Sequence, residues 1–207
     1  MKYLKILGLA AIAAGALMAF VGAGTASATQ LTCKNASGTI EVCPKGTPIH
    51  LASEGHAIFD NEALGNIECN STIEGSLTEP GTSTTTASAP IKAGGLTFTN
   101  CTSAIFQVLR AGTLEIHTQG SSANNNGTLT WTGAEWTVEK FGFHCIFSTS
   151  NTDLGTVTGS STTGATATLD ISARIPRTGG RSGIFCGESS PWTGSYKIDN
   201  PDWLDVD

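Results

Sequence analysis

Apolar and polar residues alternate along much of the chain with the two-residue period of half-buried β-strands. The clearest run spans residues 165–175, where apolar side chains hold every second position and polar ones lie between them. Successive side chains of a strand point to opposite faces, so this run turns one face to a core and the other to water. Residues 127–132 and 135–139 repeat the pattern, and Gly133-Ala134 between them predicts a tight hairpin.

Strand patterns recur through the rest of the chain, whereas helix patterns do not. Further strands are predicted at residues 39–42, 49–59, 67–77, 96–100, 105–118, 142–148, 155–159 and 192–198. Residues 79–90, 121–127 and 178–183 lack a periodic apolar face and predict loops. About ten short strands separated by Gly, Asn, Ser and Pro clusters favour an all-β fold, a two-sheet antiparallel β-sandwich of the Ig-like or jelly-roll-like kind.

The first 28 residues have the order of a secretory signal peptide. Lys2 and Lys5 precede a long apolar run, and Ala26-Ser27-Ala28 supplies a small-residue cleavage pattern. An uncleaved membrane anchor is the alternative, because the run is close to the ~20 residues that span a bilayer. We expect cleavage, a single domain over residues 29–207, and a secreted, extracellular or cell-surface protein without a membrane span.

The net negative charge of the chain disfavours some classes of binding partner. Without Lys2 and Lys5 the remaining 9 basic residues face 17 acidic ones, a net charge of about −8 where the whole chain has −6. Nucleic acids and anionic membranes recruit basic surfaces, so we expect neither as a partner. A cell-wall glycan or another surface protein remains as a candidate partner.

All of the cysteines follow the signal-like segment, and their even number predicts disulfides in an oxidising compartment. They are Cys33, Cys43, Cys69, Cys101, Cys145 and Cys186. Fifteen pairings are possible on paper. We predict sequential pairing, because the first two cysteines bracket a short hairpin and neighbouring strands usually pair in sequence. The chain has no Cys-x-x-Cys spacing, which disfavours a zinc site, and we expect no metal or cofactor.

Familiar catalytic signatures are absent from the sequence. It contains no Gly-x-Ser-x-Gly elbow, no His-Glu-x-x-His motif and no phosphate-binding loop.

His50 and His56 lie too far apart on a strand to share an ion, and a structural role is expected for all four histidines. Many carboxylates lie on strands, so a glycoside hydrolase with two of them stays an alternative, although their spacing selects no pair. The acidic C-terminal stretch 199–207 lacks the ligand spacing of a calcium loop.

Tryptophans are the residues that a β-sandwich would offer to a sugar or an apolar ligand. The aromatic residues on offer are the four tryptophans with Tyr196 and Phe143, and the candidate ligand-binding residues among them are Trp131, Trp136 and Trp192. Core packing is the competing interpretation, because an indole buries a large area and needs a partner only for its N–H.

Several short motifs carry a resemblance to a known group of proteins. Leu31-Thr32-Cys33, Val42-Cys43-Pro44, the segment 96–102, and Cys186 followed by the segments 191–198 and 201–206 resemble a group of secreted, Thr- and Gly-rich, disulfide-containing β-proteins of actinobacteria. The resemblance spans most of the chain after residue 28, and its motifs are structural. It implies an extracellular β-rich domain and no assigned activity.

We therefore predict a non-enzymatic extracellular or cell-surface protein with an interaction or structural role. A carbohydrate- or small-ligand-binding sandwich and a secreted glycoside hydrolase are the alternatives.

Overall fold

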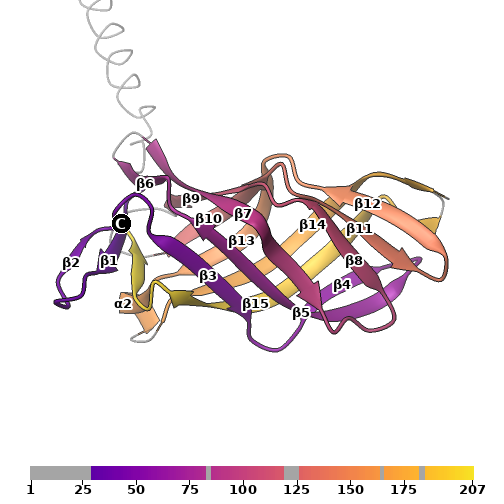
Figure 1. Cartoon of the computed structure of the whole chain (residues 1–207), viewed down its shortest axis with the longest axis horizontal. Coiled ribbons are helices and arrows are strands. Elements are labelled where there is room, and N and C mark those ends of the chain that lie inside the picture. Colours follow the sequence, from indigo (N-terminus) through magenta and orange to yellow (C-terminus); the bar gives the residue numbers. More distant parts are fainter. Residues whose placement is uncertain (1–28, 83–84, 119–125, 164–165, 182–184) are drawn as a thin grey trace, which may run out of the picture.

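The computed structural model describes residues 29–82, 85–118, 126–163, 166–181 and 185–207, and these form an antiparallel all-β fold with one short helix (Figure 1). The early strands are β1 (Leu31–Lys34), β2 (Ile40–Val42), β3 (Pro48–Ser53), β4 (Ala57–Asn61), β5 (Gly65–Ser76), β6 (Glu79–Thr82), β7 (Thr85–Thr99) and β8 (Ile105–Arg110). The later elements are β9 (Thr113–Thr118), β10 (Asn126–Thr132), β11 (Glu135–Lys140), β12 (Phe143–Ser148), β13 (Thr152–Thr158), α2 (Ser160–Thr163), β14 (Thr168–Arg181), β15 (Ser189–Asn200) and β16 (Leu204–Val206).

The strands lie in two layers. In Figure 1, β3, β5 and β7 cross in front of β13, β14 and β15. Hydrogen bonds join the layers at their edges, since β15 pairs with β3, β4 and β14, while β5 pairs with β3, β4 and β7. The predicted all-β, sandwich-like, disulfide-linked fold is confirmed, and its assignment to an Ig-like or jelly-roll-like type stays a prediction.

Two smaller groups of strands extend from this body at opposite ends of its longest axis. At one end β16, β1 and β2 form a three-stranded sheet, and the β1–β2 hairpin projects outward. At the other end the second half of β14 leaves the body and pairs with β12, which is followed by β11 and β8. Each of β2 and β8 has a single strand partner in the described pairings, so both are edge strands.

The core follows the alternation that the sequence displays. In β14 the side chains of Leu169, Ile171, Ala173 and Ile175 are buried and those between them that the structure describes are not. At the β1 end the core is aliphatic and leaves a dry void of about 30 Å³. Toward the β8 end it becomes aromatic around Trp192, whose ring packs 5.3 Å from Phe59 and 5.8 Å from Trp136, centroid to centroid.

The three disulfides pair sequentially, as predicted. Cys33 bonds to Cys43, Cys69 to Cys101, and Cys145 to Cys186. The first fixes the projecting hairpin, the second ties β5 to the segment that follows β7, and the third ties β12 to the segment that precedes β15. No cysteine is free in the described chain.

Two of the loop predictions are wrong. Residues 79–82 and 85–90 form β6 and the start of β7, where Ala87, Ala89 and Ile91 turn inward with the period of a strand. Small alanines gave too weak an apolar signal for this alternation to be recognised. Residues 178–181 continue β14, and Gly180 is required there because a Cβ would lie 2.3 Å from the His144 carbonyl oxygen of β12. Of the third predicted loop, residues 121–125 lie outside the described residues, while Asn126 and Gly127 begin β10.

Two predicted long strands are interrupted. Residues 49–59 divide into β3 and β4 around Gly55, whose φ is +89°, and both parts still pair with β5. Residues 105–118 divide into β8 and β9 at Ala111-Gly112, where the chain passes from one group of strands to the other. Glycine at 112, with a φ of +71°, permits that change of direction.

Candidate functional site

The three tryptophans proposed for ligand binding lie in the core. Trp131 and Trp192 are 0% exposed and Trp136 is 1% exposed. The Trp131 indole donates a hydrogen bond to the Ala111 carbonyl oxygen at 2.8 Å. A buried ring cannot stack on a sugar outside the protein, so this placement favours the core-packing interpretation and removes the surface on which the ligand-binding hypothesis rested.

The histidines lie apart from one another in separate surroundings. His50 pairs with Asp199, and its other nitrogen lies 3.7 Å from Glu74, which in turn pairs with Lys92. These four residues join β3, β5, β7 and β15 on the surface. The pKa of Glu74 is lowered by its hydrogen bond and charge interaction with Lys92.

No group of three His, Cys, Asp or Glu side chains in the described residues has a geometry that would hold a metal ion.

The C-terminal carboxylates do not converge on one point. Asp205 is buried and accepts hydrogen bonds from the Ser161 main-chain N–H and hydroxyl, while Asp207 accepts one from Thr32. Each of them therefore has a protein donor, which fits a role in holding β16 against α2 and β1.

Three other carboxylates, Asp60, Glu62 and Glu188, line a small groove together with Arg174. The glycoside-hydrolase alternative stays a prediction, because nothing in the geometry of this groove selects two of these carboxylates as an acid and a nucleophile or base.

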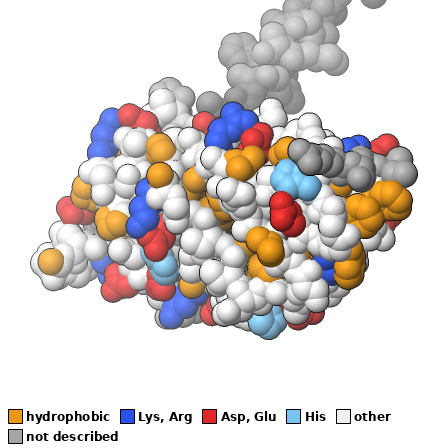
Figure 2. All heavy atoms as spheres, turned by 45° about the vertical axis from the view of Figure 1, so that its right-hand side comes forward, with side chains coloured by type: hydrophobic (Ala, Val, Ile, Leu, Met, Phe, Trp, Pro, Cys, Tyr) orange, Lys and Arg blue, Asp and Glu red, His pale blue; other side chains and the backbone are white. Residues whose placement is uncertain are grey.

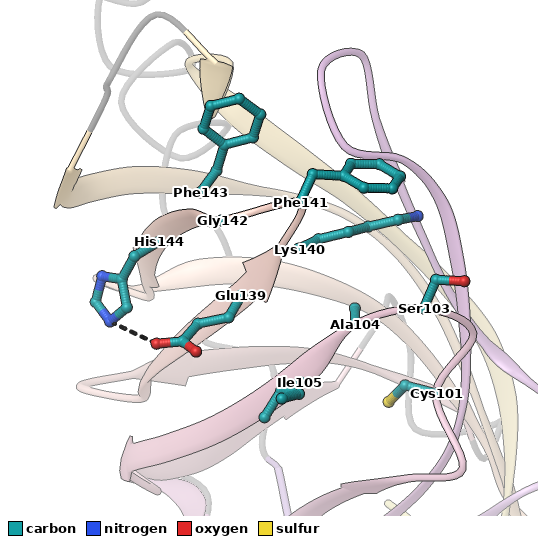
Figure 3. A pocket seen from close by; sticks show the side chains of 10 residues that line it. All are labelled: Cys101, Ser103, Ala104, Ile105, Glu139, Lys140, Phe141, Gly142, Phe143 and His144. Carbon is teal, nitrogen blue, oxygen red and sulfur yellow. Dashed lines mark ion pairs between the residues drawn. The ribbon is translucent and has the colours of Figure 1, made fainter.

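Another part of the surface combines an open groove with exposed apolar side chains. The groove has a volume of about 960 Å³ and lies between the segment from Cys101 to Ile105 and the β11–β12 hairpin (Figure 3). Ile105 is 67% exposed and Phe141 is 74% exposed. Phe143, which also lines the groove, stacks on the 46%-exposed Phe185 with centroids 4.6 Å apart. Figure 2 brings this end forward and shows hydrophobic side chains gathered there.

Phe141 owes its exposure to the turn in which it lies. Phe141 and Gly142 connect β11 to β12 with φ values of +54° and +80°, the signs of a two-residue type I′ hairpin turn. Such turns favour Asn-Gly or Gly-Gly, whereas a bulky side chain at positive φ is strained. The turn therefore holds an aromatic ring in water at a cost in backbone energy.

Strained backbone is concentrated around this groove. The described non-glycine residues with positive φ are Asn100, Ser103, Phe141 and Asn151. Ser103 and Phe141 line the groove, and Asn100 directly precedes the lining residue Cys101. Because strain of this kind persists where the surrounding structure enforces it, and gathers at functional sites, it marks the groove as the strongest candidate site.

Charged side chains of the β11–β12 hairpin border the groove. Glu139 lies 3.8 Å from His144 across the hairpin. Lys140 is 8% exposed, and its ammonium donates to the Asn66 carbonyl oxygen at 3.4 Å and lies 5.2 Å from the centre of the Phe141 ring. Lys140 thus connects the hairpin to the opposite layer and supports the Phe141 ring by a cation–π contact.

The groove does not assemble a nucleophile and a base. Ser103 lies across the groove from His144, and its hydroxyl points away from the imidazole (Figure 3). Glu139 is the one carboxylate among the lining residues, whereas glycoside hydrolysis ordinarily needs two. The arrangement suits binding, with apolar surface for contact area and a few polar groups for orientation.

This site was not predicted from the sequence. Of its residues, Phe143 was named among the aromatic side chains that could contact a ligand, Ile105 fell in the predicted strand 105–118, and Phe141 lay outside the predicted strands. A usable signal was present in Lys140-Phe141-Gly142-Phe143, where an aromatic residue takes the turn position that usually holds Asn or Gly.

The comparisons with protein-family models, curated proteins and solved structures find no match for this chain. None of the helices in the described residues has the length and apolar character needed to cross a membrane.

Proposed function

We propose that the protein is a secreted, non-enzymatic binding module of the cell exterior, and that the groove beside the β11–β12 hairpin is its binding site. The observation that carries this proposal is the strained turn that exposes Phe141 at the groove. For the fold alone, the contact with Lys140 is what an exposed aromatic ring on an unfavourable backbone provides, whereas a binding surface also gains contact area.

The remaining features of the groove support the same conclusion. Ile105 and Phe141 line the groove, and the exposed Phe185 stacks on the lining residue Phe143. Exposed apolar side chains with charged residues nearby are typical of a protein-binding or ligand-binding surface. The disulfide Cys69–Cys101 ties the groove-lining Cys101 to β5, and Cys145–Cys186 holds β12, which carries Phe143 and His144 of the groove. A site fixed in this way loses little conformational entropy when it binds.

Carbohydrate binding is a second candidate, now centred on phenylalanine. Phe141 presents an exposed ring with Glu139 and His144 as neighbouring polar groups. Apolar ring faces and flanking hydrogen-bond groups would suit a sugar, although the open groove suits a protein surface equally well.

The test is a binding panel with matched variants. The oxidised protein is assayed by co-sedimentation and surface immobilisation against cell-wall fractions, purified glycans and surface-protein fractions. Ile105→Lys is expected to weaken any specific binding at least tenfold, because it places a charge in the apolar contact. Thr193→Lys adds the same charge to the exposed side of β15, and should bind as the unmodified protein does. Equal binding by both variants would contradict the proposed site.

A further inference from the structure

Exposed apolar side chains gather at two opposite ends of the molecule. The large hydrophobic residues that are exposed in the described chain are Ile40, Val42, Ile105, Leu109, Phe141 and Phe185. The first two lie on β2 in the projecting hairpin, and the others belong to β8 and the surroundings of the groove (Figure 1). Single hydrophobic side chains scattered over a surface are ordinary, whereas exposed hydrophobic side chains concentrated at two ends of a molecule indicate interaction surfaces.

The hairpin end has the shape and rigidity of a part that is inserted. Every residue of β2 is exposed, and its outer edge has no strand partner in the described pairings. The disulfide Cys33–Cys43 closes the hairpin at its base. At its tip, the Asn35 side-chain oxygen accepts hydrogen bonds from the Ser37 and Thr39 main-chain N–H groups at 3.0 Å each. The hairpin therefore projects as a preformed element.

The groove end has the form of a receiving surface. β8 is an edge strand in which no residue is buried, and Ile105 and Leu109 point to one face of it. β8 has neither proline nor lysine, and its one charged residue, Arg110, is paired with Glu135 of β11, so its free edge is open to pairing with another strand. The groove beside it has a volume of about 960 Å³.

The residues paired with the two exposed isoleucines carry opposite charges. Lys34 lies directly across from Ile40 on the neighbouring strand, and Glu139 lies directly across from Ile105. Residues paired in this way share a face of the sheet, so each exposed isoleucine has one charged neighbour, positive on the hairpin and negative at the groove. Lys34 lies 5.1 Å from the centre of the Trp203 ring and has no carboxylate partner among the described ion pairs, while Glu139 is 54% exposed.

We infer that the partner of the groove is a second copy of this chain, whose β1–β2 hairpin docks beside β8 in a head-to-tail contact. This inference rests on the proposed binding function of the groove and names its partner. The contact is heterologous, because two different surfaces meet, so a dimer retains one free groove on one copy and one free hairpin on the other. Repetition of the contact gives rings or open filaments.

A hairpin of this size buries less area than a stable standard interface, so assembly depends on concentration. The oxidised protein, expressed from the whole chain, is followed by sedimentation velocity from micromolar to millimolar concentration. We expect dimers and longer species to increase with concentration. A monomer throughout this range overturns the inference.

Variants that block one end each test the head-to-tail geometry. Ile40→Lys disables the hairpin and Ile105→Lys disables the groove, both at exposed positions where the fold is not involved. Each variant alone is expected to remain monomeric. Because the first keeps an intact groove and the second an intact hairpin, their equimolar mixture should form a one-to-one dimer and stop there.

Thr193→Lys is the control and should assemble as the unmodified protein does. A mixture of the two variants that stays monomeric, or undiminished assembly by Ile40→Lys alone, contradicts the inference. The same Ile105→Lys protein in the binding panel separates the two proposals. If the unmodified protein is monomeric and Ile105→Lys still loses binding to a panel member, the groove is a binding site for something other than this chain.

Discussion

The Lys140 ammonium donates a hydrogen bond across the end of the sandwich to the main-chain oxygen of Asn66, at 3.4 Å. Lys140 belongs to the hairpin that carries Phe141, and Asn66 belongs to β5 in the opposite layer. A single side chain therefore connects the exposed turn of the groove to the body of the protein. Lysine is suited to this connection because its long stem is buried while its charge reaches a polar group.

Replacing Lys140 with methionine should loosen this end of the molecule without unfolding it. Methionine keeps most of the buried stem and removes both the hydrogen bond and the cation–π contact with Phe141. We expect a loss of about 1–2 kcal/mol in the free energy of unfolding. Chemical denaturation measures the loss, and amide hydrogen exchange of residues 139–144 should rise more than that of β14.

Lys197→Met is the matched control, since Lys197 is exposed on β15 and has no ion pair among the described residues. Its stability should change by less than about 0.5 kcal/mol. Equal losses of unfolding free energy in the two variants would contradict the connecting role of Lys140.

Because Trp192 is buried, its replacement should lower the stability of the fold without directly changing binding at the groove. Its ring is fully buried and contacts Phe59, Trp136 and Tyr196. Trp192→Phe should cost about 1–3 kcal/mol through loss of packing, because the smaller ring leaves a cavity. Affinity for any partner bound at the groove should stay within a factor of about two once the variant is folded. A large loss of affinity with unchanged stability would return this residue to the binding site.

The strand pattern could be predicted from the sequence because strands such as β14 obey a two-residue period, although β11 departs from it by burying Trp136, Thr137 and Val138 in succession. The cysteine pairing followed from neighbouring strands that pair in sequence. The candidate site could not be predicted, since the exposure of Phe141 depends on a turn whose residue choice goes against local preference. The burial of Trp131 and Trp192 also depends on contacts between distant strands, such as those with Ala111 and Phe59, which no local pattern reveals.

The disulfides should differ in their contributions to stability according to the loops that they close. Cys145–Cys186 spans a separation of 41 residues and Cys33–Cys43 spans 10. By loop entropy alone, the first stabilises the fold by about 4 kcal/mol and the second by about 3 kcal/mol. Double replacement of each pair by alanine, followed by denaturation, measures both. Loss of either bridge should in addition reduce self-assembly, because Cys33–Cys43 fixes the hairpin and Cys145–Cys186 fixes β12 beside the groove.

Tyr196 should remain protonated at alkaline pH for as long as the protein is folded. Burial raises the pKa of its phenol, an effect that the nearby Ser71 hydroxyl and Trp192 indole oppose only in part. A raised folded-state pKa contributes stability that is complete below the pKa of the unfolded chain, near 10, and is lost as the pH rises above it. The other tyrosine, Tyr3, lies in the signal-like segment.

Tyrosinate absorbance of the chain from residue 29 onward therefore reports Tyr196 alone. We expect no tyrosinate signal at pH values where an ordinary tyrosine ionises, followed by a cooperative rise that coincides with loss of β-structure in circular dichroism. A gradual titration near pH 10, in protein that is still folded, would contradict the burial of this phenol.

Phe141→Asn should separate stability from binding. Asparagine tolerates positive φ, and Asn-Gly is the preferred pair for a type I′ turn, so the replacement relieves the strain at φ +54°. We expect a gain of about 1 kcal/mol in the free energy of unfolding, reduced by whatever the contact with Lys140 contributes. Binding at the groove and head-to-tail assembly should both weaken, because the exposed ring is gone. A variant that is less stable and binds normally would show that the ring serves the fold. A variant that is more stable and binds more weakly, as expected, would show that the strained turn serves contact with a partner at the expense of stability.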